Sequence, residues 1–148
     1  MIQARTGLLL DPYFSASKME WLLANREAAK SSGRNLAFGT IDSWLVWKLT
    51  NGAVHATDAT NASRTMLMGL GDRGWDDELC GLFGVDPNAL PRIVDCAGPI
   101  GETDPALFGR AIPITGMAGD QQAATVGQGC LKTGETKATF GTGSWAPC

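Results

Sequence analysis

The chain has 148 residues, which is enough for one domain with a hydrophobic core. Hydrophobic residues make up 44% of the sequence and charged residues 18%, a balance typical of globular proteins rather than disordered ones. The formal net charge of −3 predicts no electrostatic attraction to nucleic acid or to an anionic membrane. The apolar runs are too short to span a bilayer, and the amino-terminal segment has no secretory pattern.

Four cysteines are spread along the chain at Cys80, Cys96, Cys130 and Cys148, and no two of them form a C-x-x-C pair. The single histidine is His55, so the sequence has no cluster of zinc ligands and predicts no bound metal ion. Widely spaced free thiols are typical of proteins in a reducing compartment, and we therefore expect a cytoplasmic protein.

The amino-terminal part predicts a strand followed by a helix. Residues 6–10 form an apolar run that predicts a short buried strand, which Asp11 and the proline after it would end. Ser17 and Glu20 have the S-x-x-E spacing of a capping box, which predicts a helix running toward Lys30.

A second helix is expected from about residue 40 or 42 to Leu49, with the left-handed formers Asn51 and Gly52 just beyond it. Apolar side chains occupy most of the circumference of this helix. The sequence therefore predicts that Trp44 and Trp47 lie in the core.

The middle of the chain predicts less regular structure. Residues 57–63 are small and polar, and they predict a structured loop. A third helix is expected to begin near Trp75, where acidic residues would lie at the positive end of the helix dipole. Residues 85–105 hold four of the seven prolines and are predicted to be mostly irregular.

The last forty residues of the chain carry the most information. Residues 111–118 predict a buried strand that leads into Asp120, and residues 121–128 predict a helix of small residues. Residues 135–140 predict another strand, which runs into a turn of very small residues at 141–144. The sequence stops soon after this turn, before any partner for the strand. Because a parallel sheet needs neighbouring strands, we expect the chain to be a piece of a longer protein.

Asp120 is a candidate catalytic residue, because it follows directly on a predicted strand. Ligands of open α/β sheets bind at the carboxyl ends of strands, and Gly116 and Gly119 would let a substrate approach the backbone closely. The aspartate has two interpretations at this point. It could be the N-cap of the following helix, or it could accept a hydroxyl proton during phosphoryl transfer. The residues alone do not decide between them.

The turn formed by Gly141, Thr142, Gly143 and Ser144 also has two interpretations. Small residues let several backbone N–H groups converge on a phosphate, and the hydroxyl groups add donors. An ordinary β-turn would use the same residues. The position of the turn about twenty residues after Asp120 favours a phosphate loop in the same site.

Four segments carry a resemblance to a known family. Residues 11–22, with the sequence DPYFSASKMEWL, resemble the first signature of the FGGY family of carbohydrate kinases. Residues 61–66 (NASRTM), 119–124 (GDQQAA) and 140–143 (FGTG) are similar to members of this family that phosphorylate glycerol. The similarity runs from about Thr6 to the last residue. Each motif is weak alone, but together they are specific.

The resemblance implies an α/β fold of the ribonuclease-H-like type found in actin and hexokinase, here incomplete. Residues 1–128 would be the later part of the substrate-binding amino-terminal domain, and residues 129–148 would begin the nucleotide-binding carboxy-terminal domain. The family's amino-terminal phosphate hairpin has no counterpart in this sequence. The upstream Arg-Glu and Trp segment and the adenosine-binding region also have none.

The resemblance also implies roles for individual residues. Asp120 matches the general base, and Gln121 and Tyr13 match residues that contact the substrate hydroxyl groups. From the sequence alone, Tyr13 would have been interpreted as a half-buried core residue. Trp145 stands where members that phosphorylate glycerol usually carry a phenylalanine against the carbon chain of the substrate, and its larger ring could narrow the pocket.

Gly141, Thr142 and Gly143 match the loop that meets the phosphates of ATP, and Mg²⁺ would arrive with the ATP. The implied reaction of the intact enzyme, which we expect to be a homo-oligomer, is phosphorylation of glycerol to glycerol 3-phosphate. Two alternatives stay open. The substrate could be another polyol or sugar, such as erythritol or xylulose, or this chain could be a folded fragment without catalytic activity.

Overall fold

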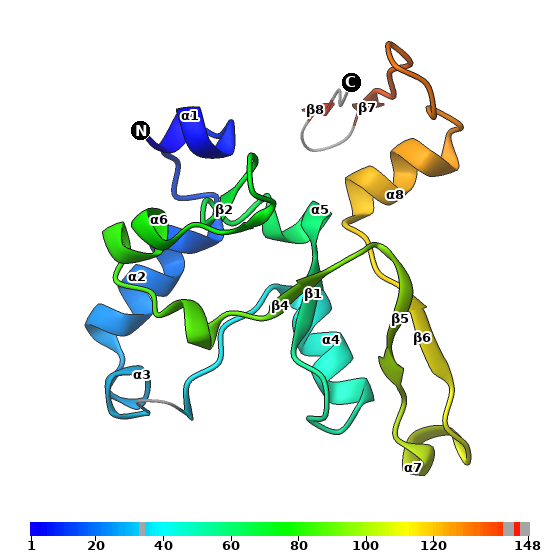
Figure 1. The fold of residues 1–148 in the computed structure, drawn as a ribbon, viewed down its shortest axis with the longest axis horizontal. Helices are drawn as coiled ribbons and strands as arrows, with labels where there is room; N and C mark the ends of the chain where they lie inside the picture. The colour runs from blue at the N-terminus through cyan, green and yellow to red at the C-terminus, as the bar shows by residue number, and fades with distance from the viewer. Residues whose placement is uncertain (33–34, 141–143, 146–148) are drawn as a thin grey trace. The chain divides into compact units, whose positions relative to one another are not determined.

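The computed structural model describes residues 1–32, 35–140 and 144–145, and the chain divides into two compact units, Met1–Met117 and Ala118–Cys148. Both units are built from helices and short strands (Figure 1). The first unit contains α1 (Ile2–Thr6), α2 (Ser15–Asn25), α3 (Glu27–Ser31), α4 (Ile41–Leu49), β1 (Ala56–Asp58), α5 (Ala59–Ala62), β2 (Met68–Gly69), β3 (Gly74–Trp75), α6 (Asp77–Leu82), the 3₁₀ helix η2 (Pro87–Ala89), β4 (Arg92–Val94), β5 (Ala97–Glu102), α7 (Pro105–Phe108) and β6 (Pro113–Gly116). The second unit contains α8 (Asp120–Gly127), β7 (Thr139–Phe140) and β8 (Ser144–Trp145).

The predicted strand at residues 6–10 is wrong. Thr6 ends α1, where its hydroxyl donates to the backbone oxygen of Ile2 at 2.9 Å, and Gly7 stops the helix in the left-handed region with a φ of 71°. Leu9 and Leu10 are exposed. An apolar run needs a facing surface to become a buried strand, and these two leucines face solvent instead.

The predicted amino-terminal helix is present, but its ends differ from the prediction. Helix α2 begins after Phe14, and the hydroxyl of Ser17 donates to the backbone oxygen of Phe14 at 3.2 Å instead of capping the helix. The helix ends at Asn25 because Arg26 is extended, and α3 follows as a separate short helix.

The larger core of the first unit is built around α2 and α6. Its buried side chains come from α2 and the residue before it, from the segment at residues 66–67, and from α6 and the residues after it. They are Phe14, Ala16, Met19, Met66, Leu67, Leu79, Cys80, Phe83, Val85 and Leu90. The third predicted helix is confirmed as α6, and the carboxylate of Asp76 caps it by accepting from the backbone N–H groups of Glu78 and Leu79, both at 3.0 Å.

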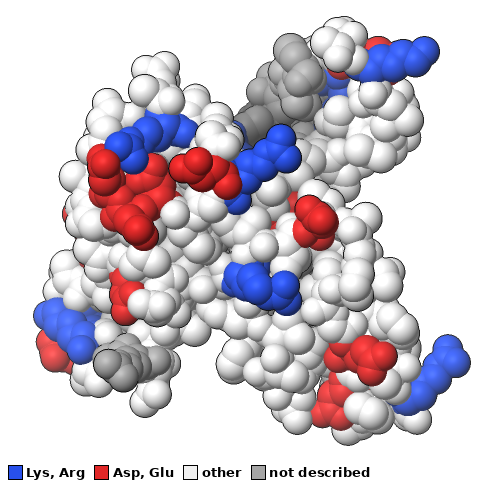
Figure 2. Space-filling model, viewed as in Figure 1, with Lys and Arg blue, Asp and Glu red and all other residues white. Residues whose placement is uncertain are grey.

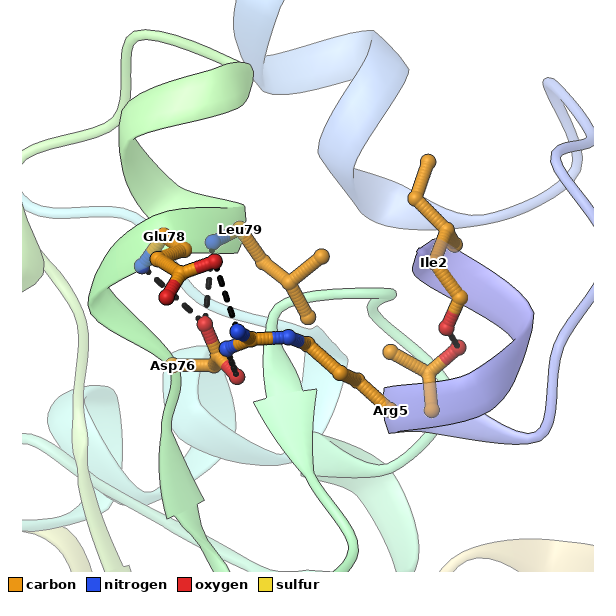
Figure 3. Close-up of polar contacts among 6 residues, drawn as sticks. Ile2, Arg5, Asp76, Glu78 and Leu79 are labelled. Atoms are coloured by element: carbon orange, nitrogen blue, oxygen red, sulfur yellow. Dashed lines mark hydrogen bonds and ion pairs between the residues drawn. The ribbon is translucent and has the colours of Figure 1, made fainter.

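Arg5 joins α1 to the capped end of α6. Its guanidinium donates to Oδ2 of Asp76 at 2.7 Å and contacts Oε2 of Glu78 at 2.6 Å (Figure 3). The hydrogen bond from Arg5 holds the pKa of Asp76 below its ordinary value. Figure 2 shows basic and acidic side chains gathered over α1 and α6, with charges of both signs interspersed elsewhere on this face.

The smaller core of the first unit lies between α4, β1 and the β5–β6 hairpin. Val46, Ala56 and Ile100 are buried there, and Val54, Val94, Ile114 and Met117 pack around them. Strands β1 and β4 pair in parallel, with Asp58 opposite Val94. Strands β5 and β6 pair antiparallel, with an irregularity between Ala97 and Gly101.

Three expectations for this region need correction. Residues 57–63 are not a loop, because they form the end of β1 and then α5. Residues 85–105 are more regular than predicted, since β4 and β5 lie within them. The strand predicted at residues 111–118 exists as β6, but most of its side chains are exposed because it forms half of a two-stranded hairpin.

Helix α4 confirms the predicted boundaries but not the predicted burial. Asn51 and Gly52 are both left-handed, with φ values of 52° and 83°. The helix buries Asp42, Ser43 and Val46 and turns its more apolar face outward. Trp44 is 56% exposed and Trp47 is 42% exposed, so the predicted core role of both is wrong within this chain. The exposed face continues through Ile41 and Leu45.

The acidic limb of the pH–stability curve should depend on Asp76. Its folded-state pKa lies below the unfolded value of about 3.9, so its ionised form adds stability above that pH, and this contribution is lost as the pH falls through the folded-state pKa. In Asp76→Asn, the capping acceptor is retained but the group cannot titrate. The free energy of unfolding, measured with urea between pH 3 and pH 7, should decrease less toward acid pH in the variant than in the native chain. An equal decrease in the free energy of unfolding of the two proteins would contradict this assignment.

Candidate functional site

The second unit begins with the helix that carries the candidate base. Gly119 is the N-cap of α8 and has extended backbone angles, while Asp120 is the first residue of the helix. Ala123 donates its backbone N–H to the oxygen of Gly119 at 2.8 Å, which closes the first turn. The helix is built from small residues and ends at Gly127, followed by the left-handed Gly129 with a φ of 78°.

The carboxylate of Asp120 does not cap this helix, so the N-cap interpretation is wrong. Its Oδ1 accepts the backbone N–H of the next residue, Gln121, at 2.8 Å. The side chain is exposed, and Oδ2 accepts no hydrogen bond from the described residues. One oxygen is thus fixed to the helix while the other can accept a proton from a ligand hydroxyl.

Gln121 makes two further hydrogen bonds. Its backbone oxygen accepts the hydroxyl of Thr125 at 2.8 Å, and its side-chain Oε1 accepts Nζ of Lys137 at 3.0 Å. Gln121 and Lys137 are both half-buried. Lys137 was not among the sequence candidates. A single lysine in a predicted strand gives no signal of this contact, because the contact depends on how the chain returns to the start of α8.

The remaining candidates in this unit are described only in part. Strands β7 and β8 pair antiparallel, with Thr139 opposite Trp145. The predicted phosphate-loop residues Gly141, Thr142 and Gly143 lie outside the described residues.

Tyr13 belongs to the first unit, where it precedes α2. It is 62% exposed, so the interpretation as a half-buried core tyrosine is wrong. Its backbone N–H donates to Oδ1 of Asp11 at 2.7 Å, and its ring lies edge-on to Phe14 with 5.4 Å between the ring centroids. The Nζ of Lys18 lies 5.9 Å from the centroid of the Tyr13 ring. These contacts present the phenol ring at the surface of the unit.

The structure shows a second polar cluster, which the sequence reasoning missed. The buried carboxylate of Asp58, at the end of β1, accepts hydrogen bonds from the backbone and side chains of Thr60 and Asn61 and from the thiol of Cys96 at 3.0 Å. Burial alone would raise the pKa of Asp58, but the hydrogen bonds from Thr60, Cys96 and Asn61 outweigh it and lower the pKa. Burial and the Asp58 carboxylate together raise the pKa of the Cys96 thiol.

The described residues contain no metal centre. Among residues 1–32, 35–140 and 144–145, no three histidine, cysteine, aspartate or glutamate side chains gather where they could hold a metal ion. In that same part of the chain, no helix combines the length and the apolar character needed to cross a membrane.

Comparison with known proteins places these features in a family. Residues 1–127 match the family described as "FGGY family of carbohydrate kinases, N-terminal domain". The chain is 57% identical over 148 residues to a glycerol kinase of Cereibacter sphaeroides, a match that covers 99% of this chain and 30% of the relative. A glycerol kinase of Rhodospirillum centenum is 57% identical over 145 residues, which is 97% of this chain and 29% of that protein. The chain therefore spans about 30% of the length of these relatives.

Solved structures agree with the sequence comparison. The crystal structure of Plasmodium falciparum glycerol kinase with ADP has a TM-score of 0.92 and 38% identity, and the match covers 98% of this chain and 29% of that one. A xylulose kinase of Rhodospirillum rubrum, with a TM-score of 0.83 and 21% identity, shares the fold alone. The expected α/β, ribonuclease-H-like kinase fold, present here in part, is confirmed. The chain belongs to the FGGY family of carbohydrate kinases.

Proposed function

We propose that the full-length protein containing this chain transfers the γ-phosphoryl group of ATP to a terminal hydroxyl of glycerol, giving glycerol 3-phosphate and ADP. The observation that carries the proposal is the exposed, half-paired carboxylate of Asp120 at the start of α8, next to an amide fixed by Lys137. The identity of 57% to glycerol kinases across almost the whole chain supports glycerol as the substrate.

Asp120 acts as the general base in this proposal. Its carboxylate accepts the proton of the glycerol hydroxyl while the hydroxyl oxygen forms a bond to the γ-phosphorus. The bond from that phosphorus to the β,γ-bridging oxygen breaks, and ADP leaves with the electron pair. Phosphoryl transfer needs positioning and charge stabilisation more than covalent participation by the protein.

The other proposed site residues bind rather than react. Gln121 and Tyr13 contact the glycerol hydroxyl groups, and Trp145 contacts the carbon chain. Thr142, between Gly141 and Gly143, contacts the ATP phosphates. Mg²⁺ accompanies the ATP, because this ion is commonly bound by substrate phosphates and water with few protein ligands.

The proposed domain division places residues 1–128 in the substrate-binding domain and residues 129–148 at the start of the nucleotide-binding domain. The family match over residues 1–127 to an amino-terminal kinase domain supports it. We propose a cytoplasmic location for the intact kinase, supported by the free thiols of Cys80, Cys96 and Cys130. We also propose that the intact kinase is a homo-oligomer.

Replacing the base tests the catalytic assignment. In the full-length kinase, Asp120→Asn should lower kcat by about 10²- to 10⁴-fold, because general base catalysis contributes that much, while the melting temperature stays near that of the native enzyme. A coupled assay for ADP release measures the rate. Asp104→Asn is the matched control, since Asp104 is a half-buried helix cap whose acceptor role asparagine can fill. A near-native kcat for Asp120→Asn would refute the assignment.

A substrate panel tests the choice of polyol. Trp145, in place of the usual phenylalanine, is the observation that favours another substrate of the same family. We expect glycerol to give the highest kcat/KM among glycerol, erythritol and xylulose. In Trp145→Phe, glycerol should still give the highest kcat/KM. The ratio of this value to the kcat/KM for erythritol or xylulose should be smaller than in the native enzyme, because a smaller ring leaves more room for a longer carbon chain. A higher kcat/KM for erythritol or xylulose with the native enzyme would replace glycerol as the proposed substrate.

The 148-residue chain alone should be a folded fragment without kinase activity. It spans about 30% of the length of the glycerol kinases it matches, so the greater part of those proteins has no counterpart in it. Isothermal titration calorimetry of the isolated chain should detect no heat of binding for either ligand at millimolar concentration. Tight binding of both ligands would overturn this expectation.

A further inference from the structure

The contact between Lys137 and Gln121 links two segments of the second unit. Lys137 lies in the irregular segment before β7, and Gln121 is the second residue of α8. The Nζ atom of Lys137 donates to Oε1 of Gln121 at 3.0 Å, and both side chains are half-buried. A lysine that pairs with a neutral amide, rather than with a carboxylate, gains less electrostatic energy than it would from an ion pair. The contact also restricts the side-chain amide of Gln121.

An ammonium group fixes the orientation of the amide it contacts. A glutamine side chain has one accepting oxygen and one NH₂ group with two donors, and the two ends are nearly the same in shape. Lys137 can only donate, so the oxygen must face it. The NH₂ group then points away from Lys137 and is available as a donor. Gln121 is thereby set to donate to a hydroxyl oxygen of a ligand rather than to accept a hydroxyl proton.

Both backbone polar groups of Gln121 take part in hydrogen bonds with side chains. Its N–H donates to Oδ1 of Asp120 at 2.8 Å, and its oxygen accepts the hydroxyl of Thr125 at 2.8 Å. The base and the amide donor are thus linked by a hydrogen bond at the start of α8. With the amide set as a donor, Asp120 is left as the proton acceptor of this pair.

We propose that Lys137 is a positioning residue, which orients the Gln121 amide as a hydrogen-bond donor to a substrate hydroxyl. The inference rests on the proposed function of Gln121 in substrate binding. Lys137 itself does not touch the substrate in this proposal. Its contact makes Gln121 the hydrogen-bond donor and leaves Asp120 as the proton acceptor.

Substitutions in the full-length kinase test the proposal. Lys137→Met keeps the length of the side chain but removes the donor, so the amide can turn. The KM for the polyol should rise roughly tenfold, the equivalent of one lost hydrogen bond, with a smaller change in kcat and none in the KM for ATP. Lys137→Arg keeps a side chain that can only donate hydrogen bonds. Its KM for the polyol should therefore stay close to that of the native enzyme. Lys132→Met, an exposed lysine of the same segment, should leave all three constants unchanged.

A double-mutant comparison separates positioning from general destabilisation. Gln121→Ala removes the amide, and adding Lys137→Met to that variant should then cause no further rise in the KM for the polyol. An additive effect would overturn the proposal. A rise in the KM for ATP instead would also overturn it, because Lys137 would then act on the nucleotide.

A spectroscopic readout keeps the inference testable even if glycerol is not the substrate. With glutamine labelled selectively with ¹⁵N, the side-chain amide signal of Gln121 should shift in Lys137→Met and stay in place in Lys132→Met. If the proposed function is wrong but the role of Lys137 is right, the enzyme will not phosphorylate glycerol, yet the Gln121 amide signal will still shift in Lys137→Met. An unchanged Gln121 amide signal in Lys137→Met would refute the role of Lys137 itself.

Discussion

The buried carboxylate of Asp58 is the interaction on which the arrangement of the smaller core depends. A buried charge is costly unless it is surrounded by donors, and Asp58 receives them from the first turn of α5 and from Cys96, which follows β4. One side chain therefore caps α5, ends β1 and fixes the segment after β4. The parallel pairing of β1 with β4 spans only three residue pairs, and the Asp58 hydrogen bonds add a further connection between the two segments. The hairpin of β5 and β6 follows directly from the fixed segment.

Helix α4 shows how incomplete this arrangement is by itself. The helix packs with Val46 in the smaller core, and the hydroxyl of Thr57 donates to Oδ2 of the buried Asp42 at 2.7 Å. Its outer face exposes Ile41, Trp44, Leu45 and Trp47 to solvent. A contiguous apolar face of this kind usually marks a surface that another part of a protein covers. This face agrees with the finding that the chain corresponds to about 30% of the kinases it matches.

The second unit contains a different kind of constraint, in which hydrogen bonds fix polar groups that a substrate would meet. The Asp120 carboxylate is tied to the helix by one oxygen, and the Gln121 amide is tied by its oxygen to Lys137. Each residue thus keeps one polar atom fixed and one free. A preorganised site of this kind loses less entropy on binding than one whose side chains must be ordered by the ligand. The exposed position of α8 leaves room for the remaining walls of the proposed site.

The sequence alone determined some of the local features and the family. The boundaries of α4 and the left-handed stop at Asn51 were readable because capping and turn preferences act over a few residues. The motif around Asp120 was readable because its residue types are specific in combination. Tertiary structure alone decided burial and long-range partners: the exposure of Trp44, the donors around Asp58 and the contact of Lys137 with Gln121. These depend on where distant segments pack, and no local pattern in the sequence encodes that position.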